Sequence, residues 1–110
     1  MTTTLFPDRL ADAVERKRSQ LLVGLDPRPD LLPVELAGDA HLSHEAAAEA
    51  SARFCCGIVD AVAPHAVGVK PQLAFFEAMG SHGLRAFEQV CVYARSAGLI
   101  VLADAKRHIA

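Results

Sequence analysis

The stretch AVGVKP, residues 66–71, decides the fold that this sequence predicts. Its apolar run from Ala66 to Val69 is short, contains β-branched valines and stops at Lys70-Pro71, a pattern that predicts a short buried strand. Two more apolar runs of this kind occur in the chain, at Leu21–Leu25 and at Leu99–Leu102. The sequence therefore predicts three short buried strands.

Helical patterns occupy the intervals before and between these strands. Apolar residues recur at helical spacing from Leu10 to Arg18, ahead of the first strand. Residues 26–38 contain three of the prolines and are expected to be irregular. A second helix should begin near Ser43, whose hydroxyl can accept a hydrogen bond from a free backbone amide, and should continue to Val62, just before Pro64.

Two further helical patterns, Gln72–Met79 and Leu84–Ala97, separate the second strand from the third. Gly80 and Gly83 are expected to divide these helices, and Gly98 is in position to end the second one. Strands and helices thus alternate along the chain. This alternation predicts an α/β fold with a parallel sheet and right-handed crossovers.

The composition restricts the class of protein. Apolar residues make up 52% of the 110-residue chain and charged residues 22%, so the chain can bury a core. A formal net charge of -2 without any Lys/Arg block argues against a nucleic-acid or membrane surface and favours a small-molecule partner. No internal repeat or linker divides the sequence, so residues 1–110 are expected to form one domain.

The opening residues do not resemble a signal peptide, and a membrane-spanning segment is not expected. Pro7 and Asp8 interrupt the opening residues where a signal peptide needs an apolar stretch, and no apolar run approaches the roughly 20 residues that cross a bilayer. The cysteines Cys55, Cys56 and Cys91 are odd in number and lack metal-site spacing. We interpret them as reduced, mostly buried thiols of a cytoplasmic protein.

Ionisable residues follow all three predicted strands: Asp26, Lys70 and Asp104, with Lys106 two residues later. In parallel α/β folds, ligands bind beyond the carboxyl ends of the strands. Neighbouring strands lie roughly 4.8 Å apart, so three adjacent strand ends span only about 10 Å. The four side chains are therefore expected to meet over one small substrate.

Asp104 and Lys106 should be close partners, because residues two apart in an extended segment point to the same side. At about 4 Å and an effective dielectric near 20, opposite unit charges attract by roughly 4 kcal/mol, which keeps both groups ionised. Any one charged residue after a strand is more often a solvated loop residue. Three consecutive strands that end this way favour a functional site.

Three linked motifs resemble a known family: VGLDPR at 23–28, VGVKPQ at 67–72 with FFE at 75–77, and LADAKR at 102–107. In this order and at this spacing they resemble the bacterial branch of the orotidine 5'-phosphate decarboxylases, which carries an Asp-Ala-Lys-Arg signature. The resemblance extends from about Phe6 to Arg107. It implies that the chain is the amino-terminal portion of a (β/α)8 TIM barrel and contains its first three βα units.

The resemblance also implies a chemistry. The family converts orotidine 5'-monophosphate to uridine 5'-monophosphate and carbon dioxide in de novo pyrimidine biosynthesis, as a homodimer and without metal or organic cofactor. By position, Asp26 and Lys70 would contact the ribose and join a charge network. Asp104 would face the departing carboxylate, and Lys106 would protonate the carbon left behind. A fixed ammonium there gains interaction as negative charge moves to that carbon in the transition state.

The end of the sequence departs from the family pattern. The family places a second Asp after the Asp-x-Lys pair, where it reaches into the partner's site, and Ile109 stands at that position here. About five of the eight strands would be missing, including the late loops in which such barrels hold a substrate phosphate. We therefore expect the 110-residue chain to be inactive by itself.

Other residues favour structural roles. His41 and His44 share a helical spacing but lack a third ligand, which argues against a metal site. Phe75 and Phe76 are expected to pack in the core rather than stack on a base. Arg28 follows Pro27 and could be either an anion contact or a solvated loop residue.

Three functional hypotheses remain open from the sequence. The first is a decarboxylase chain whose strand-end charges are active-site groups. The second is a truncated, non-catalytic interaction module that pairs its exposed sheet edges with a partner. The third is a compact nucleotide-binding α/β domain, which the absence of a glycine-rich phosphate loop and the small number of strands disfavour.

Overall fold

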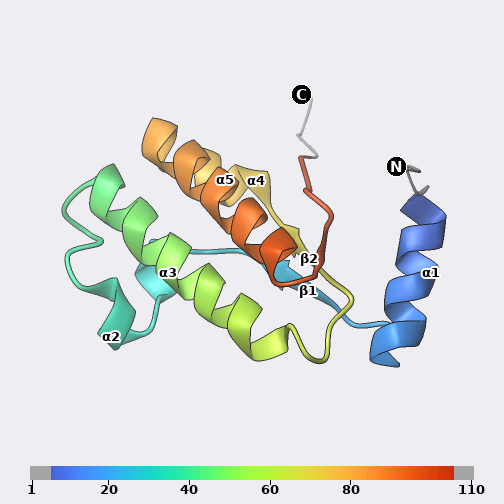
Figure 1. Cartoon of the computed structure of the whole chain (residues 1–110). Coiled ribbons are helices and arrows are strands. Elements are labelled where there is room, and N and C mark those ends of the chain that lie inside the picture. The colour runs from blue at the N-terminus through green and yellow to red at the C-terminus, as the bar shows by residue number, and fades with distance from the viewer. Residues whose placement is uncertain (1–5, 106–110) are drawn as a thin grey trace.

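The computed structural model describes residues 6–105 and contains one parallel sheet with its strands in the order β1-β2-β3. The strands are β1 (Leu22–Leu25), β2 (Gly68–Pro71) and β3 (Ile100–Val101). Figure 1 shows two long helices lying side by side across one face of this sheet. The predicted α/β fold with alternating strands and helices and a parallel sheet is confirmed.

The register of the sheet places one row of valines beneath the helices. Val23 pairs with Val69, and Val69 pairs in turn with Val101. Paired residues of neighbouring strands point to the same face, so the three side chains form one row. Val69 is fully buried in this row, and Leu25 lies two residues further along on the same face. This face of the sheet forms one side of the hydrophobic core.

Helices α3 (His44–Val62) and α5 (Gly80–Ser96) cover this face of the sheet. The predicted cap of α3 is confirmed, because the Ser43 hydroxyl accepts a hydrogen bond from the Ala46 amide at 3.0 Å. The core between the helices and the sheet contains Val59 and Val90, both completely buried. The structure confirms that the alanine-rich run is one long helix packed on the sheet.

The turn between α4 (Leu73–Glu77) and α5 differs from the prediction. Gly80 and Gly83 were expected to lie between the two helices, but Gly80 is the first residue of α5 and Gly83 lies inside it. A Cβ atom on Gly83 would lie 1.8 Å from the Phe76 carbonyl oxygen. This glycine therefore permits the close packing of α4 against the first turn of α5. Gly98 has φ +84° and follows α5, as expected for a helix-ending glycine.

The second strand also begins and ends later than expected. It was predicted over residues 66–69, with Lys70 as the residue at which the strand stops, whereas β2 contains both Lys70 and Pro71. Proline is tolerated here because it is the last residue of the strand, where its carbonyl still accepts a hydrogen bond from the Asp104 amide at 2.9 Å.

The segment between β1 and α3 is more regular than expected. It contains a 3-10 turn, η1 (Pro29–Leu31), and a short helix, α2 (Val34–Ala37). A proline stands at the start of each, where its fixed φ suits the first turn and its missing amide costs nothing. Leu32 anchors this segment in the core.

The amino-terminal helix α1 (Phe6–Lys17) begins four residues earlier than its apolar pattern indicated. It stands apart from the α3–α5 layer, at one side of the molecule (Figure 1). The Lys17 ammonium joins it to the end of α3 by donating to the Ala63 carbonyl at 2.7 Å. Within residues 6–105, no helix is both long and apolar enough to span a membrane.

Candidate functional site

The carboxyl ends of the strands bring three of the predicted site residues to one edge of the sheet. Asp26 follows β1 directly, Lys70 lies in β2, and Asp104 lies three residues beyond β3. Gly24 pairs with Lys70, and an additional parallel bridge joins Gln72 to Asp104. The predicted placement is confirmed for these three residues. Lys106 lies outside the described residues.

The side chains at this edge share the face of the sheet that the helices leave open. Lys70 points to the face opposite Val69, because neighbouring residues in a strand alternate. Its pairing partner Gly24 lies on that face too, and so does Asp26, two residues further on. A Cβ on Gly24 would lie 3.7 Å from an Asp26 carboxylate oxygen, so the missing side chain leaves space beside the carboxylate. Asp26 and Lys70 are both exposed to solvent.

Gln72 is a candidate site residue to which the sequence assigned no role. Its Oε1 atom is buried and accepts no hydrogen bond from the described residues. An unsatisfied buried acceptor costs about 1–3 kcal/mol, so a donor is expected to reach it in the functional protein. In the sequence, the only feature that could have indicated a role for Gln72 was its position directly after β2, as the last residue of the VGVKPQ motif.

The three free cysteines lie in or beside the hydrophobic core. Cys55 and Cys91 are buried and Cys56 is half-buried, which confirms the expectation of mostly buried thiols. Burial, followed by the neighbouring Cys56 and the Asp26 carboxylate, raises the pKa of the Cys55 thiol to about 12. Cys55 therefore remains protonated at neutral pH and is a poor nucleophile.

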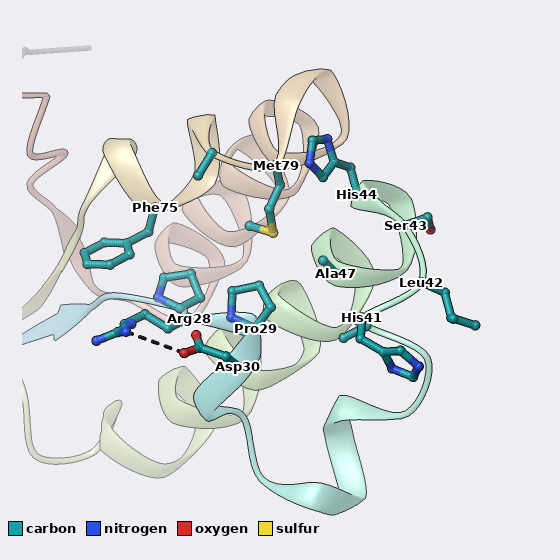
Figure 2. Close-up of a pocket in the computed structure, with 13 residues that line it drawn as sticks. Arg28, Pro29, Asp30, His41, Leu42, Ser43, His44, Ala47, Phe75 and Met79 are labelled. Carbon is teal, nitrogen blue, oxygen red and sulfur yellow. Dashed lines mark hydrogen bonds and ion pairs between the residues drawn. The ribbon is translucent and has the colours of Figure 1, made fainter.

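An open pocket of about 570 Å³ lies beside the strand ends, and its lining does not include Asp26, Lys70 or Asp104. Figure 2 shows it between η1, the segment before α3 and the α4–α5 junction. Arg28 points along its margin and forms an exposed ion pair with Asp30 at 3.5 Å. This pairing supports the interpretation of Arg28 as a solvated loop residue.

His41 and His44 line the same pocket but do not form a metal site with other ligands. Over residues 6–105, no three His, Cys, Asp or Glu side chains gather closely enough to hold a metal ion. Of the two phenylalanines predicted to be core residues, Phe76 is confirmed: it is buried and packs edge-on against Phe87, with ring centroids 5.3 Å apart. Phe75 is only half-buried and lines the pocket.

Known proteins resemble the chain in both sequence and fold. No family model matches it. Orotidine 5'-phosphate decarboxylase from Rhodopirellula baltica is 42% identical over 104 residues, which is 94% of this chain and 34% of the relative. The protein of the same name from Deinococcus radiodurans is 39% identical over 105 residues, again 34% of its length.

The fold of the chain also resembles part of a solved decarboxylase structure. The structure of Leishmania donovani OMP decarboxylase matches with a TM-score of 0.69 and 33% sequence identity, covering 94% of this chain and 34% of that one. The chain thus spans about a third of the length of the relatives that it matches.

Proposed function

We infer that the chain, which belongs by sequence and fold to the orotidine 5'-phosphate decarboxylases, supplies the amino-terminal third of such an enzyme's barrel. One observation carries this proposal: the parallel order β1-β2-β3 brings Asp26, Lys70 and Asp104 to one edge, on the open face of the sheet. That edge is where barrel enzymes build their active sites.

The proposed reaction removes carbon dioxide from orotidine 5'-monophosphate and leaves uridine 5'-monophosphate. Asp26 and Lys70 would hold the ribose, since a carboxylate accepts and an ammonium donates hydrogen bonds to sugar hydroxyls. Asp104 would lie against the departing carboxylate, and Lys106 would deliver the proton to the ring carbon as the carbon–carbon bond breaks. The protonated lysine gains interaction only as charge reaches that carbon, so its effect falls on the transition state.

We propose further that the completed enzyme works as a homodimer in the cytoplasm, within pyrimidine biosynthesis. The three free cysteines support a reducing compartment. No metal or organic cofactor is required by the proposed chemistry, because the charges come from side chains.

A covalent chimera tests the proposed function. Residues 1–107 of this chain would be fused to the remainder of the Rhodopirellula baltica relative, so that the barrel is complete and the relative supplies the second Asp. We expect loss of the substrate's ultraviolet absorbance in this chimera. The change Lys106→Ala should lower kcat by a factor of at least about 1,000 while weakening uridine 5'-monophosphate binding much less.

Arg85→Ala is the matched control, because Arg85 is an exposed cation on α5 and belongs neither to a strand nor to the residues that directly follow one. It should leave kcat within about twofold of the unmodified chimera. A folded chimera that fails to decarboxylate the substrate, or one in which Lys106→Ala retains normal turnover, would refute the proposed function.

A further inference from the structure

The face of the sheet opposite the core carries the strand-end charges. We call it the inner face, and within the strands it consists of Leu22, Gly24, Gly68, Lys70, Ile100 and Leu102. The parallel pairing extends one row beyond the strands. Leu25 pairs with Pro71, and the next amide, that of Gln72, donates to the Leu25 carbonyl at 3.1 Å. Asp26 therefore stands opposite Gln72, which on its other side forms a parallel bridge with Asp104.

This outermost row has an amide in the middle and a carboxylate on either side. Neighbouring parallel strands lie roughly 4.8 Å apart, so the backbones of Asp26 and Asp104 are separated by about 10 Å with Gln72 between them. Lys70 precedes Gln72 by two residues, and its side chain therefore points to the same face, about 6.6 Å behind the row. A long, flexible cation thus stands directly behind the amide.

The side chain of Gln72 has an acceptor that lacks a donor. Its Oε1 atom is buried and accepts no hydrogen bond from residues 6–105. The flanking carboxylates cannot supply one, because an ionised carboxylate only accepts hydrogen bonds. Lys70 can, since its ammonium carries three N–H donors and its exposed side chain is able to turn toward the row. The unsatisfied oxygen and the cation behind it therefore form a complementary pair.

We propose that Gln72 is a positioning residue whose Oε1 accepts a hydrogen bond from the Lys70 ammonium in the functional enzyme, which holds this cation midway between the two carboxylates. This inference rests on the proposed function. The bond to Gln72 uses one of the three N–H donors and leaves two, one for a flanking carboxylate and one for a ribose hydroxyl. Lys70 thus meets the substrate from a fixed position.

A neutral acceptor suits the middle of the row. It adds no third negative charge between Asp26 and Asp104, where like charges would oppose one another's ionisation. Without this acceptor, the ammonium would be drawn toward one carboxylate and away from the sugar. Such a shift matters, because a misplacement of about 1 Å can slow a reaction by a factor of about 100.

Two substitutions at Gln72 in the covalent chimera test the assignment. Gln72→Met keeps the length of the side chain but has only a weak acceptor, and it should lower kcat about 10- to 100-fold. The dissociation constant for uridine 5'-monophosphate should rise less than about fivefold, because the ammonium is displaced rather than removed. Gln72→Glu keeps an oxygen acceptor, although it adds a charge, so its kcat should exceed that of the methionine variant at least about fivefold.

Gln89→Met is the matched control. Gln89 is exposed on α5, outside the row, so the same change in chemistry should leave kcat within about twofold of the unmodified chimera. Circular dichroism checks that all variants remain folded. If Gln72→Met unfolds, Gln72→Asn takes its place, because it withdraws the acceptor by one methylene group.

The reactivity of Lys70 gives a readout that does not depend on turnover. A hydrogen bond to the ammonium favours the protonated form, which acetic anhydride cannot acylate. Gln72→Met should therefore raise the acetylation rate of Lys70 at least about threefold relative to that of Lys17 on α1, as measured by mass spectrometry of peptides. Gln89→Met should leave this ratio unchanged.

The outcomes separate positioning from packing and from the proposed function. A methionine variant as active as the unmodified chimera, or more active than the glutamate variant, would assign Gln72 to packing and overturn the proposal. Unchanged labelling of Lys70 together with lost activity would also overturn it, because the oxygen would then bind the substrate or another donor. A folded chimera that never decarboxylates the substrate refutes the proposed function, and the labelling of Lys70 then decides the role of Gln72 by itself.

Discussion

The two faces of the sheet are built from alternate residues of the same strands, yet they differ in almost every physical respect. The face beneath α3 and α5 is closed, with Leu25 and Val69 fully buried in a continuous core. The inner face carries exposed Leu22 and Leu102, two glycines and the strand-end charges. The closed face therefore contributes stability, whereas the open face carries the residues of the proposed chemistry.

This difference explains how the described residues can have a definite structure while one face of their sheet stays open. Helices α3 and α5 each cover part of the closed face. This side of the core is therefore formed by helices that are close in sequence to the strands they cover. The barrel interior is shared by all strands and is closed only when the last one pairs with the first. Substitutions on the two faces should consequently have different effects.

The largest expected effect comes from one substitution made on both faces of β1. Leu25→Ala should lower the free energy of unfolding by about 2–5 kcal/mol, because it leaves a cavity in the core. Leu22→Ala should cost less than about 1 kcal/mol in the free chain, since this side chain is already partly in water. Urea titrations followed by circular dichroism measure both. Equal costs would contradict the assignment of one closed and one open face.

Two glycines in the covering helices give a second matched pair. Gly83→Ala should destabilise the chain by about 1–3 kcal/mol, because its Cβ would collide with the Phe76 carbonyl and force α4 away from α5. Gly57→Ala in α3 should instead stabilise it by about 0.5–1 kcal/mol, since nothing lies within 4 Å of the new methyl group. Thermal unfolding of the two variants should move in opposite directions. A Gly83→Ala variant as stable as the original would disprove the close packing.

The buried thiol of Cys55 makes the stability of the folded chain depend on pH. Its pKa is raised to about 12 in the folded chain, so it keeps its proton where the unfolded thiol, with a pKa of 9.0, loses it. Its contribution to stability is fully present below pH 9 and is lost between pH 9 and about 12. The loss is at most about 1.4 kcal/mol per pH unit. The stability of Cys55→Ala should fall less steeply in urea titrations from pH 8 to 10.5, and parallel curves would argue against a buried thiol.

The smallest effect concerns the cap of the covering helix. Ser43→Ala removes the acceptor for the Ala46 amide and should cost about 1 kcal/mol. Ser43→Asp retains an acceptor at that position and should restore most of the loss. Chemical denaturation of the three proteins tests this order. A serine-to-alanine change without any cost would show that water replaces the cap.

The sequence predicted which helices and strands exist better than it predicted the residues at which they begin and end. Strand runs, the cap at Ser43 and the helix end at Gly98 were all found in the structure, because each depends on neighbouring residues alone. The division at Gly80 was predicted wrongly, and α2 was not anticipated. Glycine usually breaks helices, and only the close approach of Phe76 explains why Gly83 lies inside one.

For the site, the sequence identified charges after each strand, and the structure brought Asp26, Lys70 and Asp104 together at one edge. The roles of these residues and of Lys106 remain predictions. Gln72 was not singled out, since an amide after a strand becomes notable only when its oxygen is seen to be buried with no hydrogen-bond partner among residues 6–105. The different burial of the adjacent Phe75 and Phe76 likewise had no sequence signal.

The sequence by itself determined the order of strands and helices and the position of a charge near the end of each strand, since these follow from local apolar runs and breaks. Only the tertiary structure decided which face of the sheet became the core. The strands have apolar residues on both sides, with Leu22 and Leu25 in the same run, so local pattern cannot distinguish the faces. The distinction arises when α3 and α5 pack on one side and bury it, leaving the other side exposed.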